Sequence, residues 1–152
     1  MKVAIASDHR GFKLKQRLVQ SLRDAGIDIV DTGTCDDAAC DYPDFACPVA
    51  HQVSEGRVQR GILICGTGIG MSIVANKFRG VRAASCHDEV MVEISRRHND
   101  VNVLCLAGDL VGTRDITETV LMWLRTDFDG GRHESRIQKI GQVENERLRH
   151  GD

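Results

Sequence analysis

The sequence predicts an α/β fold: a single domain with an open parallel five-stranded sheet in a Rossmann-like, three-layer α/β/α arrangement. Strand-sized apolar runs alternate five times with amphipathic helical stretches. One run, residues 61–65, is apolar throughout, as is typical of a parallel strand covered on both faces. Because parallel strands need crossover connections, this alternation predicts helices on both faces of the sheet.

The first half of the chain predicts two strands and two helices. A strand covers residues 2–7, and a helix over about 12–25 carries Leu14, Leu18 and Leu22 near one face. Gly26 stands where a helix-ending glycine belongs, before a strand at 27–30. After a polar loop at 32–44, Pro43 suits the start of a helix that continues to about residue 56.

The second half repeats the alternation and adds a tail. Strands are predicted at 61–65, 81–86 and 101–107, and helices from the glycine turn to about 78, at 88–97 and at 113–124. A final helix, about 132–149, carries a sparse apolar stripe, namely Ile137, Ile140, Val143 and Leu148. Since such a stripe buries little against its own domain, we expect this helix to pack on a partner subunit. With no linker or repeat, residues 1–152 predict one domain.

Composition excludes several classes of function. With 41% hydrophobic and 28% charged residues the chain is typical of globular proteins, and its net charge of −2 predicts neither a nucleic-acid nor a membrane partner. The apolar runs fall far short of the roughly 18 residues of a membrane span, and the N-terminus lacks a signal-peptide core. A cytoplasmic location is expected. Six cysteines without a Cys-x-x-Cys pair predict free thiols, with no metal site.

Ligands of open parallel sheets bind outside the carboxyl ends of the strands, which selects residues 7–11, 65–70 and 107–109. In the second segment Gly66, Gly68 and Gly70 alternate before a predicted helix, so that backbone N–H groups can face an anion. Their spacing is not that of a dinucleotide-binding fingerprint. The alternative is a tight strand-to-helix turn without a ligand.

Cys65, Asp8 and His9 lie at the same predicted edge. A thiol beside a helix start can act as a base or nucleophile, although a buried cysteine that simply ends a strand is the alternative. Asp8 could equally cap the first helix, and His9 could be an exposed turn residue.

His98 and Asn99 end a helix at the opposite edge, so in a monomer they should lie away from the other candidates. The alternative is that this histidine has a purely structural role, in which its positive charge interacts favourably with the helix dipole. Arg132 and Arg136, four residues apart, share a helix face that suits either phosphate capture or plain solvation.

Taken together, these segments resemble the ribose-5-phosphate isomerase B family, which includes galactose-6-phosphate and allose-6-phosphate isomerases. The matching stretches cover almost the whole chain in the family's order: residues 7–15, 41–43, 64–70, 75–77, 80–83, 98–104 and 130–133. The resemblance implies a homodimer, or a dimer of dimers, whose active sites are shared between subunits. It implies a phosphorylated sugar as substrate and no cofactor.

The resemblance also implies residue roles. Cys65 would be the base that moves the proton between C1 and C2, while His98, assisted by Asp8, would open the sugar ring. Thr67 and the amides of Gly66, Gly68, Ile69 and Gly70 would stabilise the enediolate, as such donors do for oxyanions. His9, Arg132 and Arg136 would hold the phosphate, and Tyr42 and Asn99 would contact sugar hydroxyls.

One position departs from the family pattern. Asp109 stands where the family usually has an arginine that helps to bind phosphate, and an acid there would repel a phosphate. Arg114 is a candidate for compensation. The departure leaves open a six-carbon sugar phosphate or a non-phosphorylated aldose as substrate, besides ribose 5-phosphate. A non-catalytic sugar-phosphate-binding protein is the further alternative.

Overall fold

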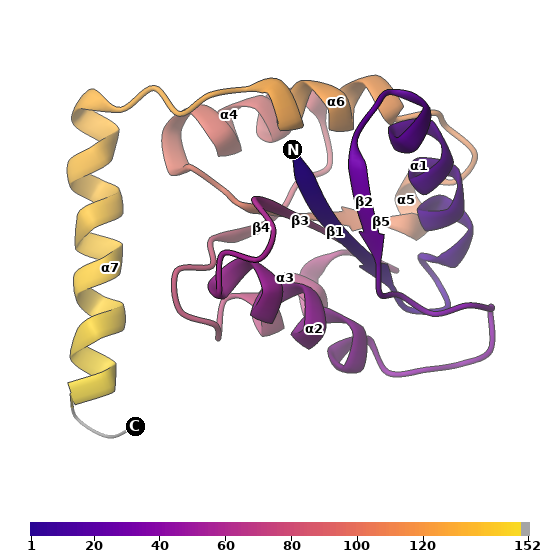
Figure 1. Ribbon diagram of the computed structural model, residues 1–152, viewed down its shortest axis with the longest axis horizontal. Helices are drawn as coiled ribbons and strands as arrows, with labels where there is room; N and C mark the ends of the chain where they lie inside the picture. The colour runs from indigo at the N-terminus through magenta and orange to yellow at the C-terminus, as the bar shows by residue number, and fades with distance from the viewer. Residues whose placement is uncertain (150–152) are drawn as a thin grey trace.

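A parallel sheet of five strands forms the centre of the molecule, in the order β2-β1-β3-β5-β4 (Figure 1). The computed structural model describes residues 1–149, and side chains as far as residue 146. The strands are β1 Lys2–Ser7, β2 Asp28–Asp31, β3 Arg60–Cys65, β4 Ala83–Ser85 and β5 Val103–Ala107. The predicted parallel α/β fold is confirmed.

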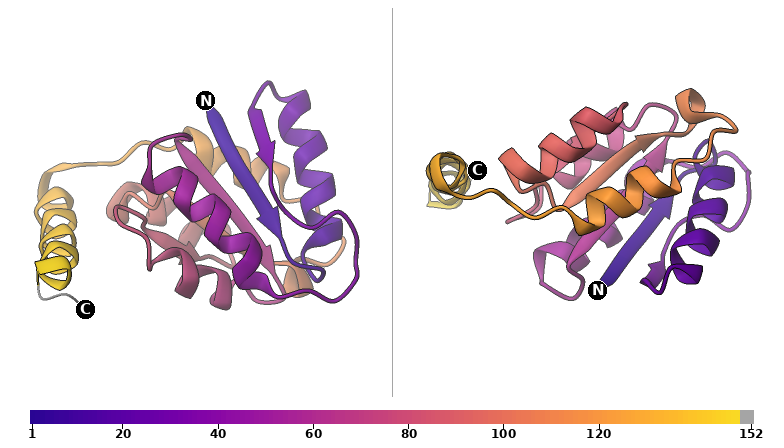
Figure 2. Two further views of the ribbon diagram at one scale, coloured as in Figure 1. Left: turned by 60° about the horizontal axis from the view of Figure 1, so that its bottom comes forward. Right: turned by 90° about the horizontal axis from the view of Figure 1, so that it is seen from above.

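Helices cover both faces of the sheet (Figure 2). They are α1 Phe12–Asp24, α2 Tyr42–Ser54, α3 Ile69–Ala75, α4 Glu89–Asn99, α5 Gly108–Val111, α6 Thr117–Arg125, a 3-10 turn η1 Gly131–His133, and α7 Glu134–Arg149. Because side chains alternate along a strand, Val3 and Ile5 pack with α1 and α6, whereas Ala4 and Ala6 pack with α2 and α3. Both resulting cores are closed to solvent.

Two predicted elements near the edge of the sheet are too long. The helix after the glycine turn ends at Ala75 rather than about 78, and β4 covers only Ala83–Ser85 instead of 81–86. Side-chain amides account for both differences. Asn76, directly after α3, donates to the carbonyl of Ser72 at 2.9 Å and accepts the N–H of Ala83 at 2.8 Å. Asn102 accepts the N–H of Arg82 at 2.8 Å, a donor that a longer β4 would use.

The predicted helix at 113–124 is also wrong at its start. A short helix, α5, follows β5 directly, and α6 begins only at Thr117. Gly112 adopts φ 59° after α5, and the Asp115 carboxylate accepts the N–H of Thr117 at 2.9 Å. This local turn at Asp115 lies directly before Ile116, the residue that precedes the first turn of α6.

Helix α7 stands apart from the rest of the chain (Figures 1 and 2). It contacts the domain through a hydrogen bond in which the N–H of Gly80 donates to Glu144 at 2.9 Å. Ile140 and Val143 of the predicted stripe are 51% and 58% exposed, and Leu148 lies outside the residues whose side chains are described. No helix within residues 1–149 has both the length and the apolar character needed to cross a membrane.

Candidate active site

The end of β3 brings Cys65 and the glycine turn together. Cys65 is 5% exposed, and its sulfur accepts the N–H of Gly68 at 3.2 Å, so it faces the turn. Gly68 has φ 76°, a left-handed conformation, and a Cβ atom there would stand 2.6 Å from Ser85 Oγ. Both the backbone conformation and the available space therefore require glycine at this position.

Asp8 and Tyr42 adjoin this turn. The N–H of Asp8 donates to the carbonyl of Ile64 at 3.2 Å, which sets Asp8 beside Cys65. Asp8 Oδ1 accepts the N–H of Gly11 at 3.0 Å, so this carboxylate also orders the start of α1. The ring of Tyr42 packs against the turn, since a Cβ atom on Gly70 would stand 2.6 Å from Tyr42 Cζ.

His9 and Thr67 make local contacts in the same region. His9 Nδ1 lies 3.2 Å from both the backbone nitrogen and the carbonyl oxygen of Cys40, so the loop before α2 holds this ring in place. Thr67 Oγ1 accepts the N–H of Ile69 at 3.3 Å. Together the residues at this edge form what we call the carboxyl-edge group, which comprises Asp8, His9, Tyr42 and residues 65–70.

The other predicted residues lie at the opposite edge. Since Gly61 pairs with Val103 and Cys65 with Ala107, the helix that leads into β5 ends near the start of β3, not its end. Four residues of strand at roughly 3.3 Å each separate the two edges by about 13 Å. His98 and Asn99 lie there, near η1 and α7, which carry Arg132 and Arg136. We call His98, Asn99, Arg132 and Arg136 the α4–α7 group.

His133 links the members of this second group, and it was not among the residues predicted for the site. Its ring stacks on that of His98 with centroids 4.2 Å apart, and Arg132 Nε lies 3.4 Å from its Nε2. Burial, and then the nearby charges of His98 and the two arginines, lower the pKa of His133 from its usual 6.5. The sequence offered one indication of this role: His133 directly follows Arg132 within residues 130–133, a stretch that matches the family.

A left-handed residue holds the end of α4 in position. Asp100 has φ 46°, and its carboxylate pairs with Arg96 Nη1 at 2.8 Å and with Arg82 Nη2 at 2.6 Å. Two ion pairs on one carboxylate fix the turn that follows Asn99. This explains how Asp100 keeps a conformation that non-glycine residues rarely adopt.

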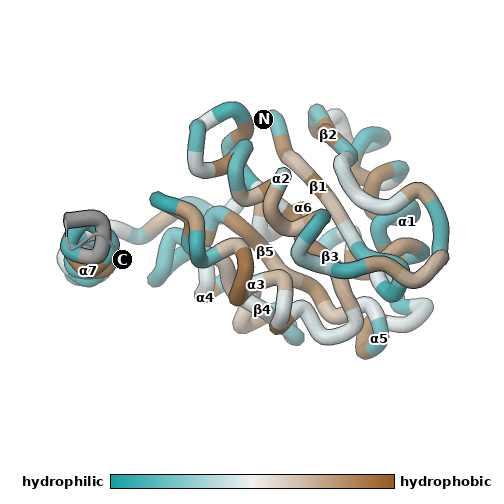
Figure 3. Tube along the Cα trace, turned by 90° about the horizontal axis from the view of Figure 1, so that it is seen from below, coloured by the Kyte–Doolittle hydropathy of each residue, from teal (hydrophilic) through white to brown (hydrophobic). Residues whose placement is uncertain are grey.

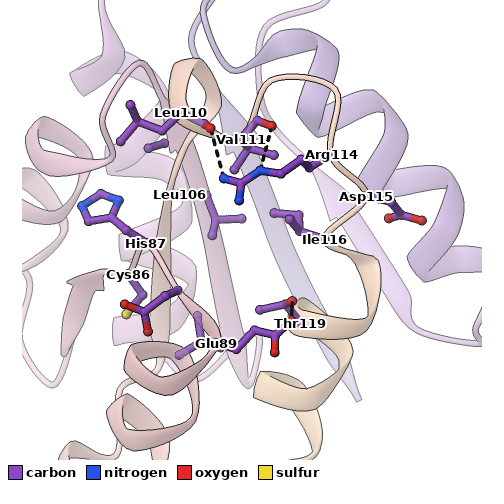
Figure 4. A pocket seen from close by; sticks show the side chains of 13 residues that line it. Cys86, His87, Glu89, Leu106, Leu110, Val111, Arg114, Asp115, Ile116 and Thr119 are labelled. Carbon is purple, nitrogen blue, oxygen red and sulfur yellow. Dashed lines mark hydrogen bonds between the residues drawn. The ribbon is translucent and has the colours of Figure 1, made fainter.

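A pocket of about 240 Å³ opens between α4, α5 and α6 (Figure 4). It is lined by Leu106, Val92 and Ile116 of the α1–α6 core, on the other face of the sheet from Cys65, and by none of the predicted site residues. Arg114 lies in this pocket, where it donates to the carbonyls of Leu110 and Val111. Within the part of the chain that is described, no three His, Cys, Asp or Glu side chains are grouped to hold a metal ion.

The fold and its carboxyl edge define an α/β protein that presents a thiol and a glycine turn where such sheets bind ligands. Residues 3–140 match the family described as Ribose/Galactose Isomerase. The chain belongs to this family, and it is an isomerase.

Several relatives resemble the chain over nearly its full length. Ribose-5-phosphate isomerase B of Escherichia coli is 43% identical, with 96% of this chain and 98% of the relative covered. The solved structure of the Clostridium thermocellum ribose-5-phosphate isomerase B has a TM-score of 0.93 at 45% identity, and covers 96% of this chain and 99% of its own. That of Mycoplasma genitalium, solved with bound ribulose-5-phosphate, has a TM-score of 0.91 at 41% identity, with 95% and 97% covered.

Proposed function

We propose that this chain interconverts ribose 5-phosphate and ribulose 5-phosphate in the cytoplasm, as one isomerase domain of residues 1–152 that works in a homodimer or a dimer of dimers. The observation that carries the proposal is the hydrogen bond from the Gly68 N–H to Cys65 Sγ beside Asp8. A base and a set of backbone donors at one point are what proton transfer next to a carbonyl requires.

Cys65 takes the proton from C2 of the open-chain aldose, and the resulting enediolate carries its negative charge on O1. The thiol returns the proton to C1, while O1 gains a proton and O2 loses one, which completes the ketose. We assign stabilisation of this charge to Thr67 and the amides of residues 66–70; without substrate, the N–H of Gly68 donates to Cys65 Sγ and that of Ile69 to Thr67 Oγ1. Burial raises the pKa of two other buried thiols, Cys86 and Cys105, which disfavours either of them as the base.

The remaining roles fall on the α4–α7 group of a second subunit. His98 of that subunit donates the proton that opens the furanose ring, with Asp8 assisting, and Asn99 and Tyr42 contact sugar hydroxyls. Arg132 and Arg136 hold the phosphate together with His9. The separation of about 13 Å between the two edges within one chain supports this division, since one subunit alone does not bring both groups to the same sugar.

Exposed apolar side chains support a homodimer. Ile69 and Ile73 of α3 are 53% and 55% exposed, and Val90 and Ile94 of α4 are 65% and 40% exposed. These two helices flank the edge strand β4, and Figure 3 shows hydrophobic segments along them. Exposed apolar patches of this kind mark sites of protein association.

An assay with a panel of aldoses tests the substrate: ribose 5-phosphate, six-carbon aldose 6-phosphates and free ribose. The highest kcat/KM is expected for ribose 5-phosphate. If kcat/KM is higher for a six-carbon sugar phosphate or for free ribose, that sugar is the substrate instead of ribose 5-phosphate. Asp109 leaves this alternative open. Binding without any turnover would contradict the isomerase itself.

A further inference from the structure

Arg10 and Asp109 form an ion pair that spans the mouth of the carboxyl-edge group. Arg10 belongs to the turn after β1, and Asp109 lies at the start of α5, after β5. Arg10 Nη2 donates to Asp109 Oδ2, so the pair crosses the end of β3, the strand that lies between β1 and β5.

The pair lies directly on the glycine turn. A Cβ atom on Gly66 would stand 2.8 Å from Asp109 Oδ2 and 2.9 Å from Arg10 Cζ, and the N–H of Asp109 donates to the carbonyl of Gly66 at 3.2 Å. The N–H of Arg10 donates to Asp8 Oδ1 at 2.9 Å. The backbone of Arg10 is thus held by Asp8 and that of Asp109 by Gly66, which places the ion pair next to Cys65.

Stability does not account for this pair. The side chains are 57% and 36% exposed, and exposed ion pairs typically contribute only about 0–1 kcal/mol because water screens them. A guanidinium has five N–H donors, and the carboxylate of Asp109 takes one of its arms. The rest of the group is free to donate to an oxyanion in the opening of the site.

We propose that Arg10, positioned by Asp109, is a substrate-binding residue that contacts the anionic phosphate end of the sugar. A planar guanidinium matches phosphate oxygens in pairs, and its neighbour on the same turn is His9, to which phosphate binding is assigned above. The pairing also removes the repulsion expected from Asp109, because its charge is balanced by Arg10 before a phosphate arrives. The inference rests on the proposed function in that the ligand is a phosphorylated sugar.

The test replaces Arg10 by Met and compares turnover and binding. Arg10→Met should raise KM for the phosphorylated aldose about ten-fold with kcat nearly unchanged, and should leave KM for the free aldose unaltered. Arg57→Met is the matched control: Arg57 is 58% exposed and paired with Glu55, remote from the carboxyl edge, so this variant should behave as wild type. If the ratio of KM for the phosphorylated aldose to KM for the free aldose is the same in Arg10→Met as in the wild type, the proposal is overturned.

A double variant shows whether Arg10 binds substrate or only stabilises the local structure. In Arg10→Met the unpaired Asp109 carboxylate repels phosphate, so adding Asp109→Asn should restore part of the lost affinity. If the ion pair has only a structural role, no such recovery is expected. A double variant whose KM for the phosphorylated aldose is as high as that of Arg10→Met would overturn the inference.

Calorimetric titration with inorganic phosphate separates this proposal from the proposed function. If the wild type turns over no aldose but binds phosphate more tightly than Arg10→Met does, the isomerase assignment fails and the role of Arg10 holds. If Arg10→Met binds phosphate as well as the wild type does, or the wild type binds none, the role of Arg10 fails whatever the turnover.

Discussion

The carboxyl-edge group and the α4–α7 group differ in what they offer a sugar phosphate. The first presents a buried thiol and a glycine turn, and the adjoining Arg10 is paired with Asp109. The second carries two arginines and a stacked histidine pair, at the far edge of the sheet. The first group suits proton transfer at C1 and C2, with His9 and the adjoining Arg10 toward the phosphate, and the second suits capture of the anion. The proposed dimer would bring the two groups to one sugar.

Removal of the thiol should have the largest effect. Cys65→Ala removes the proposed base, and turnover should fall about 10³-fold, since a positioned base typically contributes 10²- to 10⁴-fold. The measurement is kcat, with a thermal melt to show that the fold is retained. Cys86→Ala, a buried thiol on the other face of the sheet, is the control and should stay active. Turnover retained in Cys65→Ala would move the base elsewhere.

Mixing two inactive variants tests whether the two groups act on one substrate across subunits. Cys65→Ala and His98→Ala, unfolded and refolded together, should recover about a quarter of wild-type activity, because half of the random dimers are mixed and each of these has one intact site. Neither variant alone should be active. No recovery, despite mixed dimers on native electrophoresis, would mean that each site lies within one chain.

A charge on the exposed stripe of α7 should weaken the dimer and spare the subunit fold. Val143 is 58% exposed in the single chain, so Val143→Glu should raise the dimer dissociation constant at least about ten-fold while the far-ultraviolet spectrum stays unchanged. Light scattering over a dilution series measures this constant. Gln142→Glu adds the same charge at the neighbouring residue and should raise the dissociation constant less. Equal increases in the two variants would show that the apolar stripe does not lie in the interface.

Two glycines with the same conformation but different surroundings test the turn itself. Gly26 has φ 80° with open space around its Cα, whereas Gly68 has φ 76° and is crowded by Ser85. Gly26→Ala should cost about 1 kcal/mol of the free energy of unfolding, and Gly68→Ala at least about 2 kcal/mol because the added methyl also collides. Urea denaturation measures both, and equal costs would argue against the crowding.

The smallest expected effect is on the titration of His133. Its pKa is lowered from 6.5 in the folded chain, so below pH 6.5 the unfolded chain binds more protons and the free energy of unfolding decreases. A proton NMR titration should give a midpoint below 6.5 for His133. The loss of stability on acidification should be smaller in His133→Gln, and a midpoint above 6.5 would contradict the burial of this ring beside cationic neighbours.

Periodicity and glycine placement predict most of the fold from the sequence. The helix ending at Gly26, the start of α2 at Pro43 and the apolar strand that ends at Cys65 depend on neighbours in the chain, and all three are confirmed. The extents of β4 and α3 were wrong because the side chains of Asn76 and Asn102 bond backbone groups that lie 7 and 20 residues away in the chain. Local propensity contains no information on such pairings.

The sequence by itself determined the parallel fold, the family and the candidate residues at the strand ends, because strand direction fixes which turns share an edge. Only the tertiary structure decided how these residues are divided. The register of β3 and β5 separates His98 from Cys65, the stacking of His98 on His133 joins α4 to the arginines of η1 and α7, and Asp109 pairs with Arg10. Each of these depends on a contact between segments more than thirty residues apart, which packing of the whole chain sets.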